Sequence, residues 1–153
     1  MKAMNNMVQK IKGFQHMDLN CGTNVIRQGS LVAWDSTNKV IKEAASDAEC
    51  AKLLGVAMDT VPVASNIDNG VTSVPKTMNA GYNDMFNLNT TVGETYENFT
   101  PVYMGADAQT VTTVAGTNQI GYVRLASGKA SVTGAAGVMV PVYVFSNYPV
   151  VSA

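Results

Sequence analysis

Short runs of alternating apolar and polar residues, separated by turn-forming residues, cover most of this chain. The best organised is "SLVAWDSTNKVIKEA" (30–44), in which residues 31–34 place successive side chains on opposite faces. That period of two is what a β-strand produces. The polar run 35–38 then predicts a turn into a second strand at 39–42, so this segment is expected to form a β-hairpin.

A short helix is predicted to follow the hairpin, over "SDAECAKLL" (46–54). Ser46 is a favoured capping residue, and Glu49 stands three residues later, which is the spacing of a capping box. Gly55 is expected to end this helix. The run "GVAMDTVPV" (55–63) is then predicted to continue as another strand.

The same order of patterns recurs later in the chain, within "FTPVYMGADAQTVTTVAGTNQIGYVRL" (99–125). A strand, a polar turn, a second strand, a connector and an aliphatic-Gly-aliphatic strand follow one another in both places. The matched positions are Val32 with Val102, Val40 with Val111, and Gly55 with Gly121. Their spacing is not constant, and it suggests an imperfect internal duplication. The predicted fold is therefore all-β: a small antiparallel β-barrel or sandwich domain with two related halves and one short helix.

Composition agrees with this fold class. Charged residues make up 14% of the 153 residues, against about 25% in a typical soluble domain. Val, Thr and Asn dominate instead, and they favour strands and turns. The length fits one domain, which we place at residues 21–153, preceded by an extended N-terminal arm at residues 1–20.

The first 17 residues carry three lysines and no acid, whereas the rest of the chain has seven bases and eleven acids. Apolar residues at helical spacing, from Met4 to Ile11, precede a breaker at Gly13. A short Met-bearing amphipathic stretch of this kind can adapt to an apolar groove on a partner. The alternative is an arm that folds back on its own domain, and the sequence leaves both open.

Residues that carry chemistry are sparse. The one histidine is His16, and Cys21 and Cys50 stand far apart without a CxxC motif, so neither a catalytic pair nor a zinc site is indicated. We expect both cysteines to be buried reduced thiols, Trp34 and Tyr122 to be core residues, and the protein to be non-enzymatic, with no metal and no cofactor.

Charge and hydropathy also limit the partners and the location. A formal net charge of −1 argues against a nucleic-acid partner. No apolar run reaches the ~18 residues of a membrane span. The N-terminus lacks the continuous apolar core of a signal peptide, so we expect the protein to be made in the cytoplasm.

The segment "GSLVAWDSTNKVIKEAASDAECAKLLGVAMDTV" (29–61), with the later "IGYV" (120–123), resembles the head decoration (cement) proteins of tailed bacteriophages. The likeness covers about residues 24–125. It implies a small β-barrel or β-tulip body on the outer capsid surface of a virion, made in the host cytoplasm and often assembled as a homotrimer on the major capsid protein lattice. It also implies an extended arm that reaches across neighbouring capsid subunits. The candidate capsid-contact residues of that arm are Lys2, Met4, Met7, Val8, Lys10, Ile11, Lys12 and Phe14.

Three other interpretations stay open at this point. A glycan- or receptor-binding β-module of a phage fibre or adhesin would present exposed aromatic residues that converge on one end of the domain. A tail-tube or other shell subunit would assemble alone into rings or shells. A small enzyme is disfavoured because one histidine and no metal set are available.

Overall fold

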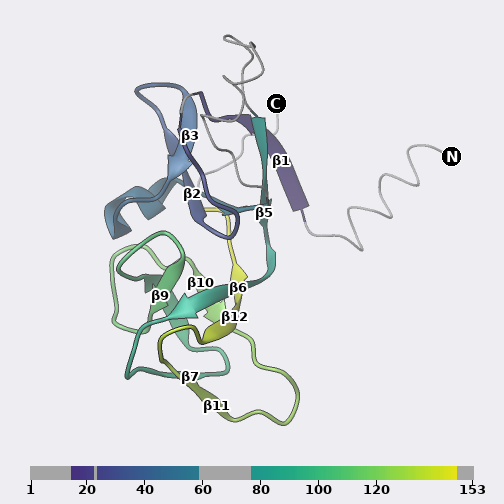
Figure 1. Ribbon diagram of the computed structural model, residues 1–153, viewed down its shortest axis with the longest axis vertical. Helices are drawn as coiled ribbons and strands as arrows, with labels where there is room; N and C mark the ends of the chain where they lie inside the picture. Colours follow the sequence, from purple (N-terminus) through teal and green to yellow (C-terminus); the bar gives the residue numbers. More distant parts are fainter. Residues whose placement is uncertain (1–14, 23, 59–76, 148–153) are drawn as a thin grey trace, which may run out of the picture.

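A computed structural model describes residues 15–22, 24–58 and 77–147 (Figure 1). Twelve strands and one short 3-10 helix make up its regular structure, which confirms the all-β prediction. The strands form an open five-stranded sheet, a closed five-stranded barrel and a small two-stranded sheet. In Figure 1 the open sheet occupies the upper half of the view and the barrel the lower half.

The open sheet is built from the first part of the chain and has the order β1-β5-β4-β2-β3, with every pair antiparallel. We call it, with its helix, the first repeat. Its elements are β1 (Gln15–Asn20), β2 (Leu31–Asp35), β3 (Val40–Glu43), η1 (Asp47–Lys52), β4 (Leu53–Ala57) and β5 (Thr77–Tyr82). The edge strands β1 and β3 also contact each other.

The closed barrel follows in the chain and is called the second repeat. Its pairs are antiparallel except for β6 with β9, a parallel pair that closes the barrel. Its strands are β6 (Asp84–Thr90), β8 (Pro101–Met104), β9 (Thr110–Thr112), β10 (Gly121–Val123) and β12 (Met139–Val144). The remaining strands, β7 (Thr95–Glu97) and β11 (Ser131–Thr133), pair only with each other.

The two repeats have the same topology. In chain order the strands β1, β2, β3, β4 and β5 correspond to β6, β8, β9, β10 and β12, and the sheet order β1-β5-β4-β2-β3 becomes β6-β12-β10-β8-β9. The register is the same across each of the four shared antiparallel pairs: Val32–Gly55 corresponds to Val102–Gly121, Ala33–Lys42 to Tyr103–Thr112, Val56–Gly81 to Tyr122–Tyr143, and Gln15–Tyr82 to Asp84–Val144.

Equivalent positions also carry equivalent backbone bonds and core side chains. Gly29 and Ser30 exchange hydrogen bonds with Ala57, as Phe99 and Thr100 do with Val123. The core of the first repeat consists of Cys21, Ile26, Val32, Ile41, Leu54 and Ala57. The last five of these correspond to Tyr96, Val102, Val111, Ile120 and Val123 in the second repeat, all of which belong to the larger core cluster.

The two repeats pack on each other through the outer face of the first one. Six of its residues point away from its own core and join the core cluster of the barrel: Leu31, Ala33, Ala44, Cys50, Leu53 and Val56. At this contact the Leu31 backbone N–H donates to the Ala108 carbonyl at 2.6 Å. The Asp47 carboxylate accepts from the backbone N–H groups of Thr117 and Asn118 at 3.0 and 3.3 Å. Apolar burial and satisfied polar groups therefore hold the repeats together.

Several local predictions need correction. The strand β1 pairs with β5 along its whole length, so the sheet begins at Gln15, inside the range assigned to the arm. Val111 corresponds to Ile41 and not to Val40, because Lys42 pairs with Ala33 as Thr112 pairs with Tyr103. The predicted hairpin of β2 and β3 is confirmed.

The predicted capping box is also wrong. Ser46 precedes a 3-10 helix and makes no side-chain capping bond, while the Glu49 carboxylate accepts from the Ala45 N–H and pairs with Lys42. Gly55 does not end the helix, because it lies inside β4 with a φ of +151°. A Cβ there would stand 2.1 Å from the Gly81 carbonyl oxygen, so glycine is required by the close approach of β5.

Candidate functional site: an exposed aromatic face

The outer surface of the barrel carries a cluster of aromatic rings, which we call the aromatic face. It consists of Phe99, Tyr122, Tyr143 and Phe145, with the Arg124 guanidinium 5.4 Å from the centre of the Phe99 ring. The Tyr122 ring lies 5.2 Å from Tyr143, 5.9 Å from Phe145 and 6.1 Å from Phe99. All four separations are within the range in which aromatic rings and cations over rings attract each other.

Strand alternation positions this face. On β10, Gly121 and Val123 are buried and Tyr122 points out, and on β12 the residues Val142 and Val144 are buried and Tyr143 points out. Tyr122 and Tyr143 are directly paired across the two strands, and their rings are stacked at 17°. Cross-strand aromatic pairs of this kind stabilise a sheet by roughly 0.2–1 kcal/mol relative to Ala.

Phe99 occupies an unfavourable backbone conformation. Its φ is +64°, where its counterpart in the first repeat is Gly29 with a φ of +84°. A bulky residue in this region is an outlier, and the strain costs roughly 1–2 kcal/mol. The Phe99 side chain is nevertheless 66% exposed. The fold recovers little of this cost through burial of the ring, and outliers of this kind cluster at functional sites.

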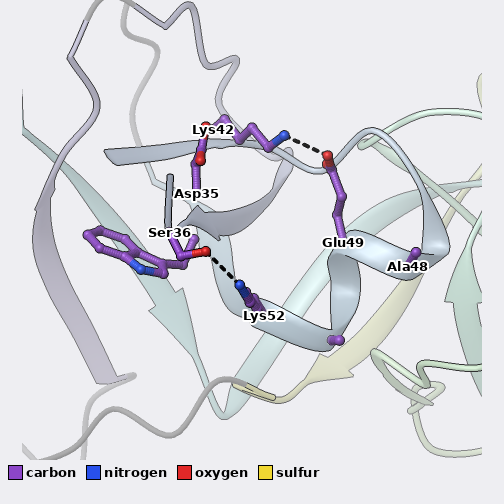
Figure 2. A pocket seen from close by; sticks show the side chains of 8 residues that line it. Asp35, Ser36, Lys42, Ala48, Glu49 and Lys52 are labelled. Carbon is purple, nitrogen blue, oxygen red and sulfur yellow. Dashed lines mark hydrogen bonds and ion pairs between the residues drawn. The ribbon is translucent and has the colours of Figure 1, made fainter. Parts of the chain in front are cut away.

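A second candidate is a solvent-open hollow of about 280 Å³ in the first repeat (Figure 2). It lies between β2, β3 and η1, and its residues are Trp34, Asp35, Ser36, Lys42, Ala48, Glu49, Ala51 and Lys52.

The charged groups of this hollow bind one another. Lys42 pairs with Glu49 at 2.5 Å, and the Lys52 Nζ donates to the Ser36 Oγ at 2.8 Å. The Asp35 carboxylate accepts from the Asn38 side-chain amide and from the backbone N–H groups of Asn38 and Thr37, and these hydrogen bonds lower its pKa. These groups therefore stabilise the loop and helix around the hollow, and its apolar wall is left as the surface for a ligand.

Two half-buried carboxylate networks are structural. Burial opposes ionisation of Glu43, but hydrogen bonds from Arg27 and Ser30 outweigh it and lower its pKa. Burial likewise opposes ionisation of Glu94, and hydrogen bonds from Thr112 and the Thr113 backbone lower its pKa overall. Each carboxylate thus joins segments distant in sequence.

The Cys50 thiol is not activated as a nucleophile. Burial, with Asp47 and Glu49 nearby, raises the pKa of the Cys50 thiol to about 12, so this thiol stays protonated at neutral pH. Both cysteines are buried, as predicted. Within residues 15–22, 24–58 and 77–147, no group of three or more His, Cys, Asp or Glu side chains is placed to hold a metal ion.

The residues that were singled out from the sequence do not come together in one site of the described structure. The candidate arm residues from Lys2 to Phe14 lie outside the described residues. Tyr122 is not a core residue, since it stands on the outer face of β10. Trp34 is only half-buried and packs at the edge of the first core. The importance of Phe99 and Arg124 was missed, because only the duplication shows that a large ring stands where the first repeat has glycine.

No protein-family model matches this sequence, and no curated protein matches it. In the described part of the chain, no helix is both long enough and apolar enough to span a membrane.

Proposed function

We propose that this protein is a non-enzymatic virion component that binds the outer surface of an assembled phage capsid and stabilises it, as a decoration or cement protein. The observation that carries the proposal is the aromatic face, a cluster of half-buried rings on a closed barrel with its strained Phe99 exposed. Exposed aromatic residues with an arginine are typical of protein interfaces. The resemblance of residues 24–125 to phage head decoration proteins supplies the setting.

In this proposal the arm supplies contact with the shell. Its candidate contacts are the lysines and apolar residues between Lys2 and Phe14, which would order on a groove between capsid subunits. Each bound copy adds buried area across a seam of the lattice. Because the protein binds the assembled lattice and not loose subunits, it stabilises the shell by mass action.

A glycan-binding module is the second candidate, because it also predicts aromatic rings gathered on one surface. The arrangement of the rings favours a protein partner instead. A sugar ring packs on one exposed aromatic face, whereas Tyr122 and Tyr143 are stacked on each other. Stacking covers one face of each ring, and each ring also carries a hydroxyl group that can donate a hydrogen bond. That arrangement suits a protein surface that can accept their hydrogen bonds.

Co-sedimentation with capsids that lack the protein tests the proposal. We expect saturable binding of the full chain and at least a tenfold weaker binding of a chain that lacks residues 1–13, with an unchanged melting temperature of the body. A chain with Lys2, Lys10 and Lys12 replaced by Gln isolates the charge of the arm. Lys39→Gln with Lys129→Gln is its control, because both lysines are exposed on the body. Equal binding by the truncated chain would refute the role of the arm.

A further inference from the structure

The contact between the two repeats joins two different surfaces, one on each repeat, and each repeat also has an equivalent of the surface that the other one uses. Within the chain, the outer face of the first repeat packs on a surface of the second repeat that includes Met104, Thr117 and Asn118. We call this surface the seat. Because the strands of the two repeats share topology and register, the strands of the second repeat present an equivalent outer face, without a counterpart of η1, and the first repeat presents an equivalent seat. Within the described residues, Val114 on the equivalent outer face is 68% exposed, and the equivalent seat is a solvent-open hollow.

The free outer face overlaps the aromatic face. Five of the six positions at which the first repeat packs on the second, all except Cys50 on η1, lie on or beside strands and have counterparts in the second repeat: Pro101, Tyr103, Val114, Gln119 and Tyr122. Ala44, which lies two residues beyond Lys42, is 2% exposed. Its counterpart Val114, two residues beyond Thr112, is 68% exposed. An apolar position that is buried in one repeat and open in the other indicates a surface that lacks its partner.

The free seat coincides with the hollow of Figure 2. In the second repeat, the seat includes Met104, which contacts the Cys50 sulfur at 3.9 Å, and the residues Thr117 and Asn118, which bind Asp47. Trp34 stands at the position of Met104 in the shared register, because Trp34 pairs with Ile41 as Met104 pairs with Val111.

Two further residues of the hollow correspond to seat residues of the second repeat in the same way. Ala51 and Lys52 are the two residues before Leu53, as Thr117 and Asn118 are the two before its counterpart Gln119. Trp34, Ala51 and Lys52 all line the hollow. Met104 is covered by the first repeat, whereas Trp34 is half-buried and Ala51 and Lys52 are exposed.

We infer that a second copy of this chain docks head to tail, with the outer face of its second repeat on the Trp34 seat of the first repeat. The interface between the repeats is the internal example of this contact. The free surfaces are chemically complementary, because aromatic rings of one copy meet the apolar wall of the hollow, formed by Trp34, Ala48 and Ala51, with Lys52 at its rim. A ring edge fills such a hollow, and a lysine ammonium binds ring faces and tyrosine hydroxyl groups.

A head-to-tail contact of this kind uses two different surfaces, so it is heterologous. It forms a ring when the rotation between successive copies closes and an open filament when it does not. The inference deepens the proposed function by naming the neighbour of each copy on the shell, and a ring would present several arms at once. Simultaneous attachment by several arms raises the overall affinity well above that of one arm.

Sedimentation velocity over a concentration series tests the inference with the full chain. Two single variants each block one surface: Ala51→Arg fills the seat, and Val114→Arg places a charge on the outer face. Both positions are exposed, so the fold is expected to survive. Val92→Arg is the matched control, since Val92 is 70% exposed and lies outside both surfaces. Ala48→Arg provides a second seat variant if Ala51→Arg lowers the melting temperature.

We expect the wild-type chain and Val92→Arg to associate, and each blocking variant alone to lose at least tenfold in association. An equimolar mixture of Ala51→Arg and Val114→Arg should form a dimer and stop there, because one intact seat and one intact face remain between them. A wild-type chain that stays monomeric at every concentration would overturn the inference. So would an Ala51→Arg variant that associates normally, since contact between two identical faces does not need the seat.

These outcomes are separate from those of capsid binding. A monomer that saturates capsids overturns only the head-to-tail contact, whereas a ring that does not bind capsids overturns only the decoration role. Unlimited growth into filaments or tubes would support the contact and favour a self-assembling tube or shell subunit.

Discussion

The glycine at the same position in β4 and β10, the central strand of each repeat, provides the sharpest test of the packing. At Gly121 a Cβ would stand 2.0 Å from the Tyr143 carbonyl oxygen, whereas ordinary contact begins near 3.4 Å. Gly121 has no unusual φ, so Gly121→Ala introduces this collision alone. Both strands are held by neighbours in the closed barrel, so the carbonyl cannot retreat without loss of ladder hydrogen bonds. We expect a cost of about 3 kcal/mol, typical of severe overpacking.

For a chain of this length the cost corresponds to a fall in melting temperature of roughly 6–12 °C. Gly55→Ala should cost at least as much, because its Cβ meets the Gly81 carbonyl oxygen and its φ is +151°. Gly93→Ala is the control, since its φ is +85° and no atom lies within 4 Å of the added Cβ. It should cost only about 1 kcal/mol. If thermal unfolding shows equal losses for Gly121→Ala and Gly93→Ala, the argument from close strand approach is wrong.

Three further predictions concern single side chains. Tyr96→Phe should cost about 1–3 kcal/mol in urea unfolding, because it leaves the Thr91 N–H and the Glu94 carboxylate without the buried hydroxyl, while Tyr103→Phe should cost almost nothing. Glu94 has a lowered folded pKa, so its contribution is complete above the unfolded value of about 4.3 and is lost as pH falls through the folded pKa. Glu94→Gln should therefore be less stable than wild type at pH 7, and the gap should narrow in the acid range. Trp34→Ala should cost about 2 kcal/mol, below the 3–5 kcal/mol of a fully buried tryptophan.

The sequence predicted the strands well where alternation and turn chemistry agreed. The β2–β3 hairpin and the recurrence of a strand with a central glycine were visible because side-chain periodicity and turn residues are local signals. The matched positions Val32 with Val102 and Gly55 with Gly121 are confirmed by the shared register.

The remaining features depend on contacts that local patterns do not carry. Gly55 was interpreted as a helix stop, and its real constraint is the backbone of β5, a strand more than twenty residues away in the chain. The prediction that Tyr122 is a core residue was wrong, because strand alternation defines the two faces of a strand but does not show which face packs on the core. The seat around Trp34 has no local sequence signal, because it is defined by its equivalence to the Met104 surface, which the first repeat covers.

Binding to capsids that lack the protein is the measurement that tests the proposed function most directly. Purified full-length chain should co-sediment with such shells, saturate at a fixed number of copies per shell and raise the temperature at which the shells disassemble. Absence of saturable binding, together with a stable chain that binds a glycan through the aromatic face, would contradict the decoration role and favour a carbohydrate-binding module.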